Sequence, residues 1–322
     1  MMAITLDSLA RDIEDFLAFK RALGYSYRRG EATLRSFERF AYAHAGRGAT
    51  GRSKMVLATT LKAFLSRIEG RKAVSAANEL GALRQLCLYR RRRDPHGYVP
   101  EHGWALRTES VYLPYIFSRE EIRDLLDTAN RHCGRNIPGP MLRTLILVLY
   151  CTGLRFGEAV RLSLSDVDLK RCTFLIRESK GRTRLVPFGE DLAREILAYL
   201  GERMRTAAAK VDALFVRNSG SALTLGSASQ AVRRLLRQLG LKPAAGRLGP
   251  RPYDLRHAYA VHRLTQWYHD GVDIHARLPW LSAYMGHVNV LGTEVYLHAT
   301  PELLQLASDR FADRLNRPRS AP

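Results

Sequence analysis

Apolar residues recur at helical spacing along most of this 322-residue chain, and one long stretch interrupts that pattern. Between residues 94 and 117 the periodicity disappears among prolines and glycines, as is typical of a linker. The pattern therefore predicts a first domain over residues 1–93, a second over 118–300 and a tail over 301–322. In the first domain it predicts a compact bundle of four amphipathic helices, over residues 7–23, 31–45, 54–68 and 74–92.

The second domain is also mainly helical, but it contains a short β element. Ser118, with Glu121 three residues later, forms a capping-box pattern that marks a helix start. Two short runs, 172–177 and 183–188, predict a β-hairpin joined by residues 178–182. The fold class is therefore mainly α, with a small β-hairpin or sheet. Further helices are predicted directly after T-G-L-R and over residues 140–151, 189–206, 225–239, 252–269, 276–286 and 302–315.

Positive charge is spread over the whole chain. Lys and Arg number 51 against 31 Asp and Glu, which gives a formal net charge of +20 and a pI near 10.3. Residues 1–110 hold 20 of the basic residues and 11 of the acidic ones, so both domains are basic. Such an excess predicts a polyanionic partner, and nucleic acid is the usual one.

The sequence predicts no membrane segment, secretion signal or disulfide framework. Its four cysteines, at positions 87, 133, 151 and 172, include no close pair, which favours reduced thiols over a zinc site. The N-terminus has early acidic residues and no apolar signal core, and the most apolar stretch, 145–151, is too short to span a bilayer. We therefore expect a soluble cytoplasmic protein associated with the nucleoid.

Five residues of the second domain are candidates for chemistry on a phosphate. Taken singly, each has an ordinary structural interpretation, such as a solvated arginine, a turn lysine, a helix-capping histidine or a core tyrosine. Only their combination favours a functional site. In chain order they are Arg155 in T-G-L-R-F-G-E, Lys180 in S-K-G-R, Arg256 in Y-D-L-R-H, His287 after Gly286, and Tyr296 nine residues beyond His287.

These residue types match the needs of a phosphoryl transfer. A guanidinium can hold two non-bridging oxygens, and a lysine on a hairpin can donate a proton to the leaving oxygen. A tyrosine can attack phosphorus, although its phenol, with a pKa near ~10, needs neighbouring cations or a base. Neither H-E-x-x-H nor a Walker-type phosphate loop occurs in the chain. Transesterification conserves the phosphodiester bond energy, so we expect no cofactor and no metal.

The order Arg, Lys, Arg, His, Tyr, with its flanking residues, resembles the tyrosine recombinase, or phage integrase, family. T-G-L-R-F-G-E-A-V-R-L is similar to that family's first arginine box, and S-K-G-R-T-R-L-V-P-F to its hairpin lysine segment. D-L-R-H-A-Y-A-V-H resembles the second arginine box, and M-G-H followed by Tyr296 resembles the His–Tyr end. The motifs cover residues 118–300, and the resemblance implies a two-domain, C-shaped DNA clamp.

The resemblance also implies a role for each candidate. Arg155 and Arg256 would bind the scissile phosphate and His287 would hydrogen-bond to it. Lys180 would be the general acid and Tyr296 the nucleophile of a 3′-phosphotyrosyl link. The family usually has histidine three residues before the second arginine, where this chain has Tyr253. Because a phenol is a poor base at neutral pH, we expect Tyr253 to orient the phosphate or the nucleophile.

Two neighbours of the arginines are assigned structural roles. His257 follows Arg256 directly, and adjacent residues on a helix diverge, so we expect His257 to point away from the site. Glu158 lies just inside the helix after Arg155, and we expect it to orient an arginine rather than to take part in catalysis.

The implied partner is double-stranded DNA with inverted sites, bound by two protomers per site and four in the synapse. Accessory recombinases or DNA-bending proteins fit the same scheme, as do integration and the transposition of a mobile element. The tail either packs on its own domain or docks on a neighbouring protomer. Predicted contacts to the DNA backbone are Arg90, Arg91, Arg92, Arg93 and Arg182.

Three other functions share some of these features. A type IB topoisomerase would use the same chemistry to relax supercoils without a specific site. A DNA-binding regulator with an impaired site would lack some of the five candidates. A metal-dependent nuclease would need divalent ions and would stop in EDTA.

Overall fold

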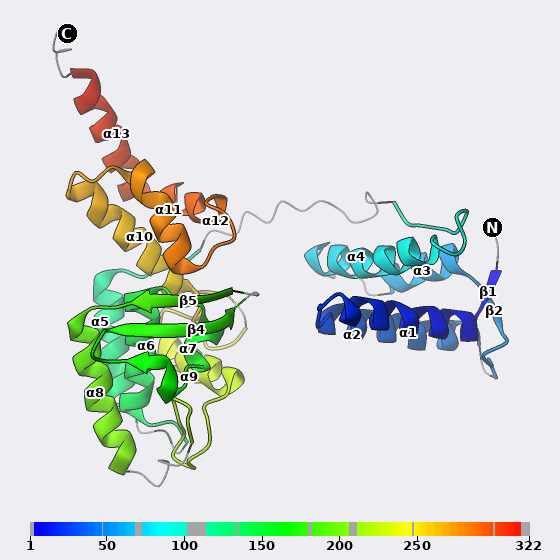
Figure 1. Cartoon of the computed structure of the whole chain (residues 1–322), viewed down its shortest axis with the longest axis horizontal. Helices are drawn as coiled ribbons and strands as arrows, with labels where there is room; N and C mark the ends of the chain where they lie inside the picture. The colour runs from blue at the N-terminus through cyan, green and yellow to red at the C-terminus, as the bar shows by residue number, and fades with distance from the viewer. Residues whose placement is uncertain are drawn as a thin grey trace. The chain divides into compact units, whose positions relative to one another are not determined.

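The computed structural model divides the chain into two compact units, Met1–Val111 and Tyr112–Pro322 (Figure 1). The division falls within the stretch 94–117 that the sequence marks as a linker. Parts of the predicted features lie outside the described residues, among them Lys180, residues 102–113 of the linker stretch and residues 317–322 of the tail. The structure describes residues 3–46, 48–67, 73–101, 114–132, 134, 136–179, 182–205, 211–246, 248–298 and 300–316.

The first unit is a helical bundle with a small sheet at its start. Apolar side chains of every helix meet in one core, which includes Phe16, Phe37, Phe64 and Leu83. The prediction that a helix begins at residue 54 is wrong, because residues 54–56 form a strand and the helix begins at Leu57. Strands of three residues are too short to leave a pattern. The elements are β1 (Ala3–Thr5), α1 (Leu6–Ala22), α2 (Arg28–His44), β2 (Lys54–Val56), α3 (Leu57–Ser66) and α4 (Ala73–Arg90), with β1 antiparallel to β2.

Helix α6 (Gly139–Thr152) is the centre of the second unit. Leu142, Leu145, Ile146 and Leu149 are all at most 1% exposed, because other helices pack around α6. The capping box predicted at Ser118 is present at the start of the neighbouring α5. The helices nearest in sequence are α5 (Arg119–Asn130), α7 (Phe156–Val160), η2 (Leu164–Asp166), α8 (Glu190–Arg205) and α9 (Leu225–Gln238).

A three-stranded antiparallel sheet, in the order β3-β4-β5, covers part of this core. The predicted hairpin is confirmed, but its first strand begins one residue later and extends further than expected. Cys172 has φ 49°, a left-handed conformation that an extended strand does not contain. Ser179 pairs with Arg182. The strands are β3 (Val167–Asp168), β4 (Thr173–Ser179) and β5 (Arg182–Pro187).

The C-terminal helices gather at one end of the second unit around a separate apolar core (Figure 1). Leu303 of the last helix is 0% exposed in this core, and Arg310 Nη1 donates to the Val272 carbonyl, so the last helix packs on its own unit. The short helices at 291–298 were not predicted, since Gly292 and their length suggest a loop. The elements are α10 (Asp254–His269), α11 (Ile274–Met285), α12 (Leu291–Glu294), η4 (Val295–His298) and α13 (Pro301–Asn316).

Candidate active site

The sequence T-G-L-R forms a tight turn that presents Arg155 at the start of α7. Gly153 ends α6 with φ 59°, and a Cβ built on it would lie 2.3 Å from Cδ1 of Tyr259. Only glycine combines this backbone conformation with such a close approach. Arg155 is therefore the N-terminal capping residue of α7, as the motif predicts.

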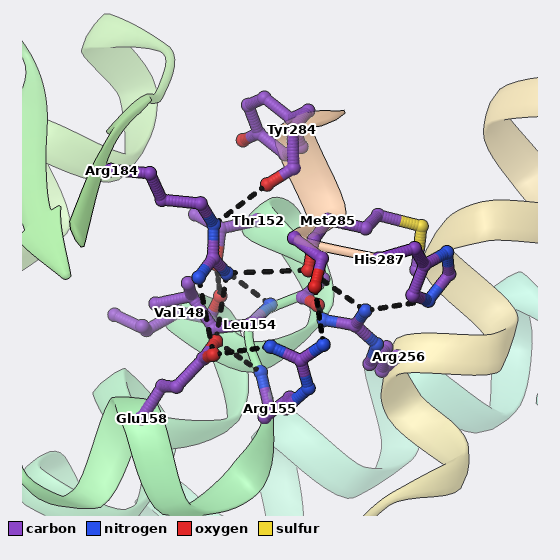
Figure 2. Close-up of polar contacts among 12 residues, drawn as sticks. Val148, Thr152, Leu154, Arg155, Glu158, Arg184, Arg256, Tyr284, Met285 and His287 are labelled. Atoms are coloured by element: carbon purple, nitrogen blue, oxygen red, sulfur yellow. Dashed lines mark hydrogen bonds and ion pairs between the residues drawn. The ribbon is translucent and has the colours of Figure 1, made fainter. Parts of the chain in front are cut away.

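The Arg155 guanidinium is held between a carboxylate and a backbone carbonyl (Figure 2). Its Nη1 lies 2.7 Å from Oε1 of Glu158, and its Nη2 donates to the Gly286 carbonyl at 2.5 Å. Glu158 also binds Arg184 of β5, with 2.8 Å between Oε2 and Nη2. The prediction that Glu158 orients an arginine is confirmed, and Glu158 orients two of them.

Arg256 is the most deeply buried of the candidates that the structure describes, with 1% of its surface exposed. Its Nη1 donates to the Gly153 carbonyl at 2.6 Å and its Nη2 to the Met285 carbonyl at 2.9 Å. Burial lowers the pKa of this guanidinium, because the charged form loses hydration. Its Nε has no hydrogen-bond partner among the described residues. An anion bound beside Arg256 would therefore neutralise its buried charge and accept a hydrogen bond from Nε.

His287 lies against Arg256, and one ring orientation accounts for both of its contacts. Its Nε2 is 2.8 Å from Arg256 Nη2, and its Nδ1 is 2.7 Å from Oγ1 of Thr293 (the Arg256 contact is drawn in Figure 2). Because arginine can only donate, Nε2 accepts and the neutral ring carries its proton on Nδ1. Thr293, which is 0% exposed, was missed by the sequence analysis because it lies in an unpredicted helix.

Tyr296 lies in η4 and is 2% exposed. Burial raises the pKa of its phenol, whereas the cationic charge of Arg256 and Arg155 opposes that rise. The His287 and Tyr296 rings are roughly parallel, with 6.3 Å between their centroids. The structure therefore brings both arginines, His287 and Tyr296 into one cluster.

The expectation that His257 points away from the site is wrong. Its Nδ1 lies 3.0 Å from Oη of Tyr296. The residue does diverge from Arg256 on α10, but η4 packs against that face and brings Tyr296 to it. Burial lowers the pKa of His257 to about 4. No signal within the second arginine box identifies this contact, because the partner lies 39 residues away.

The other predicted residues occupy more peripheral positions. Tyr253 is the N-terminal capping residue of α10 and is 39% exposed, with its ring 5.0 Å from that of His257. Arg182 is exposed at the start of β5. In the first unit, Arg90 forms an ion pair with Asp12, with 2.6 Å between Nε and Oδ2, while the next three arginines are exposed.

Comparison with known proteins identifies the family. A sequence model of the phage integrase family matches residues 116–302, more than half of the chain. The chain belongs to the phage integrase family of tyrosine recombinases. This recombinase is 31% identical over 316 residues to a Sinorhizobium fredii protein named integrase/recombinase y4rB, covering 96% of this chain and 98% of the relative. It is 28% identical over 234 residues to tyrosine recombinase XerC of Staphylococcus saprophyticus, covering 73% and 74%.

Solved structures share the fold of this recombinase. The Tn1549 transposon integrase in complex with transposon right end DNA matches with a TM-score of 0.68 at 16% identity, covering 96% of this chain and 100% of that one. The XerH site-specific recombinase bound to palindromic difH substrate matches with a TM-score of 0.63 at 22% identity, covering 88% and 78%. The mainly helical fold with a small sheet is that of these proteins.

Two features are absent from the described residues. Within those ranges, His, Cys, Asp and Glu side chains form no group of three or more that could hold a metal ion. Across the same part of the chain, every helix is too short or too polar to cross a membrane.

Proposed function

We propose that this recombinase cuts and rejoins duplex DNA by transesterification through Tyr296, with a 3′-phosphotyrosyl intermediate. The observation that carries the proposal is the position of Arg256, a buried guanidinium that contacts His287 and opposes the rise that burial causes in the pKa of Tyr296. Cationic donors fixed beside a nucleophile stabilise the charge that develops on a phosphorane. Protein groups already hold both arginines, so little reorganisation is needed during reaction.

The proposed roles follow from the chemistry of each side chain. Arg155 and Arg256 hold the non-bridging oxygens of the scissile phosphate, and His287, once its Nε2 is protonated and released from Arg256, donates a further hydrogen bond to it. Lys180 protonates the leaving 5′ oxygen. Tyr253 borders the phosphate or the nucleophile without taking a proton, because a phenol is a poor base at neutral pH.

The proposed partner is duplex DNA with inverted binding sites. The names of the relatives and the DNA complexes among the solved structures support this partner, as does the net charge of +20. We place two protomers on each site and four in the synapse, in the cytoplasm. The linker spans 94–117, and α13, while packed on its own unit, contacts a neighbouring protomer. Exposed arginines assigned to the DNA backbone are Arg91, Arg92, Arg93 and Arg182.

A covalent-adduct assay tests this function. A library of nicked duplexes with a randomised segment is incubated with the protein, and adducts are selected and sequenced to give a working substrate. We expect wild type and Tyr284→Phe to form an adduct in EDTA, and Tyr296→Phe to form none. Tyr284 is the matched control, because its hydroxyl donates to the Pro187 carbonyl at 2.8 Å. An adduct with Tyr296→Phe, or one that maps to another tyrosine, contradicts the proposal.

Product analysis then separates recombination from simple relaxation. A recombinase joins two different duplexes that carry the selected site. A type IB topoisomerase relaxes one supercoiled circle of any sequence. We expect joined products from the selected site and none from a scrambled one.

A further inference from the structure

His257 and Tyr296 form a hydrogen-bonded pair inside the second unit. Nδ1 of His257 lies 3.0 Å from Oη of Tyr296, and the two ring centroids are 5.4 Å apart. Tyr296 is 2% exposed and the His257 side chain 14% exposed. Because water reaches this phenol poorly, its proton has to leave through a protein group when the oxygen attacks.

The surroundings of His257 keep its ring neutral. The charged groups that act on it are Asp254, Arg256 and Arg251, and the phenol of Tyr296 faces its Nδ1. Nε2 lies 3.9 Å from Oδ1 of Asp254, a carboxylate that is 0% exposed. The pKa of about 4 keeps the ring neutral at pH 7, with a lone pair available to the phenol. An imidazolium formed there would be stabilised by Asp254.

Tyr253 occupies the position where the family resemblance leads one to expect a histidine base. Its side chain is 39% exposed, and its ring meets that of His257 edge-on at 5.0 Å. A neutral phenol donates a hydrogen bond readily but binds a proton poorly. Tyr253 is therefore not suited to take the proton of Tyr296. His257, whose imidazole can bind a proton, lies one turn further along α10.

The geometry points to His257 as the general base that takes the phenolic proton of Tyr296, an inference that rests on the proposed function. In cleavage, Oη bonds to phosphorus and its proton passes to Nδ1. The bond from phosphorus to the 5′ oxygen breaks, and that oxygen leaves with the electron pair and a proton from Lys180. In rejoining, a 5′-hydroxyl attacks phosphorus and returns a proton to Lys180, while the departing phenolate recovers its own from His257.

The test follows the pH dependence of adduct formation in single-turnover experiments. The substrate is the selected duplex with a 5′-bridging sulfur, a leaving group that needs no acid, so that only activation of the nucleophile is measured. The variant is His257→Asn, whose amide oxygen lies near the place of Nδ1 and accepts the same hydrogen bond without taking a proton. The matched control is His262→Asn, because His262 lies on the same helix as His257 and its Nδ1 is 2.8 Å from Oη of Tyr150.

For wild type and the control, we expect a log rate that is flat between pH 6 and 9. For His257→Asn we expect a rate at pH 7 that is lower by about 10²-fold, rising about tenfold per pH unit as tyrosinate forms. A variant that matches wild type, or one that is slower with a flat profile, overturns the inference while leaving the proposed function intact. If wild type forms no adduct with any library member, the proposed function fails and the inference with it.

Discussion

Glu158 and Arg184 form a buried ion pair that connects the β-hairpin to the first arginine. Oε2 of Glu158 lies 2.8 Å from Nη2 of Arg184, and their side chains are 1% and 13% exposed. The same carboxylate binds Arg155, and Arg184 also donates to the carbonyls of Tyr284 and Met285 (Figure 2). A strand of the hairpin, the α7 turn and the end of α11 therefore share one charge network.

Glu158→Gln is expected to lower the free energy of unfolding by about 3 kcal/mol, because it leaves two guanidiniums without a buried counter-charge. Urea denaturation measures the loss. The matched control is Glu202→Gln, since Glu202 is half exposed and 3.9 Å from Arg205. That exposed pair contributes at most about 1 kcal/mol. Equal effects of the two substitutions would contradict the network.

Gly286→Ala is expected to impair both stability and adduct formation. Gly286 has φ 71°, and a Cβ there would lie 2.7 Å from Cζ of Arg184, which Glu158 holds in place. Gly240 has the same φ and open space around it, so Gly240→Ala carries only the backbone cost of about 1–2 kcal/mol. We expect Gly286→Ala to lose at least about 1 kcal/mol more in urea denaturation, and to form adducts more slowly, because displacing Arg184 disrupts its hydrogen bonds.

Thr293→Val is expected to slow adduct formation about tenfold, a loss of about 1.4 kcal/mol of transition-state stabilisation. The hydroxyl of Thr293 accepts from Nδ1 of His287, and this contact leaves Nε2 facing Arg256. Valine has the same shape without the acceptor, so the ring loses its fixed orientation. Thr293→Ser keeps the hydroxyl and should react at nearly the wild-type rate. A slow serine variant would mean that the methyl group matters, rather than the hydrogen bond.

The local parts of this site follow from sequence, because short-range chemistry determines them. Gly153 and Gly286 end helices in the left-handed conformation. The motifs around these glycines predict that Arg155 and His287 follow shortly after a helix end. The helices of both units were predictable for the same reason, because each buries one face and its apolar residues therefore recur at helical spacing.

The contacts between distant elements were not predictable. Arg184 and Glu158 are 26 residues apart, and His257 and Tyr296 are 39 apart. Both pairs depend on how helices and strands pack, and a one-dimensional pattern does not contain that information. The strands at 3–5 and 54–56 were missed because three residues show no alternation.

The lowered pKa of His257 predicts that the folded chain loses stability in mild acid. Its pKa in the folded chain is about 4, below the ordinary 6.5, so the unfolded chain binds the proton more tightly. The contribution of His257 to the free energy of unfolding is complete above pH 6.5. It is lost as the pH falls towards 4, and the full loss is about 3 kcal/mol. Urea denaturation at pH 7.5 and pH 5 should show a larger drop for wild type than for His257→Asn. Parallel drops would mean that other groups control the acid sensitivity.

The arginines at the end of α4 and just after it are predicted to divide into two roles. Arg90 is 16% exposed and paired with Asp12, whereas Arg92 is exposed, with its guanidinium 4.5 Å from the Phe19 ring centre. If Arg92 contacts a DNA phosphate, Arg92→Gln lowers the slope of log affinity against log salt by about 0.9. Arg90→Gln should instead cost about 1 kcal/mol of folding free energy and leave that slope unchanged. Salt titrations on one random-sequence duplex measure both slopes, and an unchanged slope for Arg92→Gln would remove it from the DNA interface.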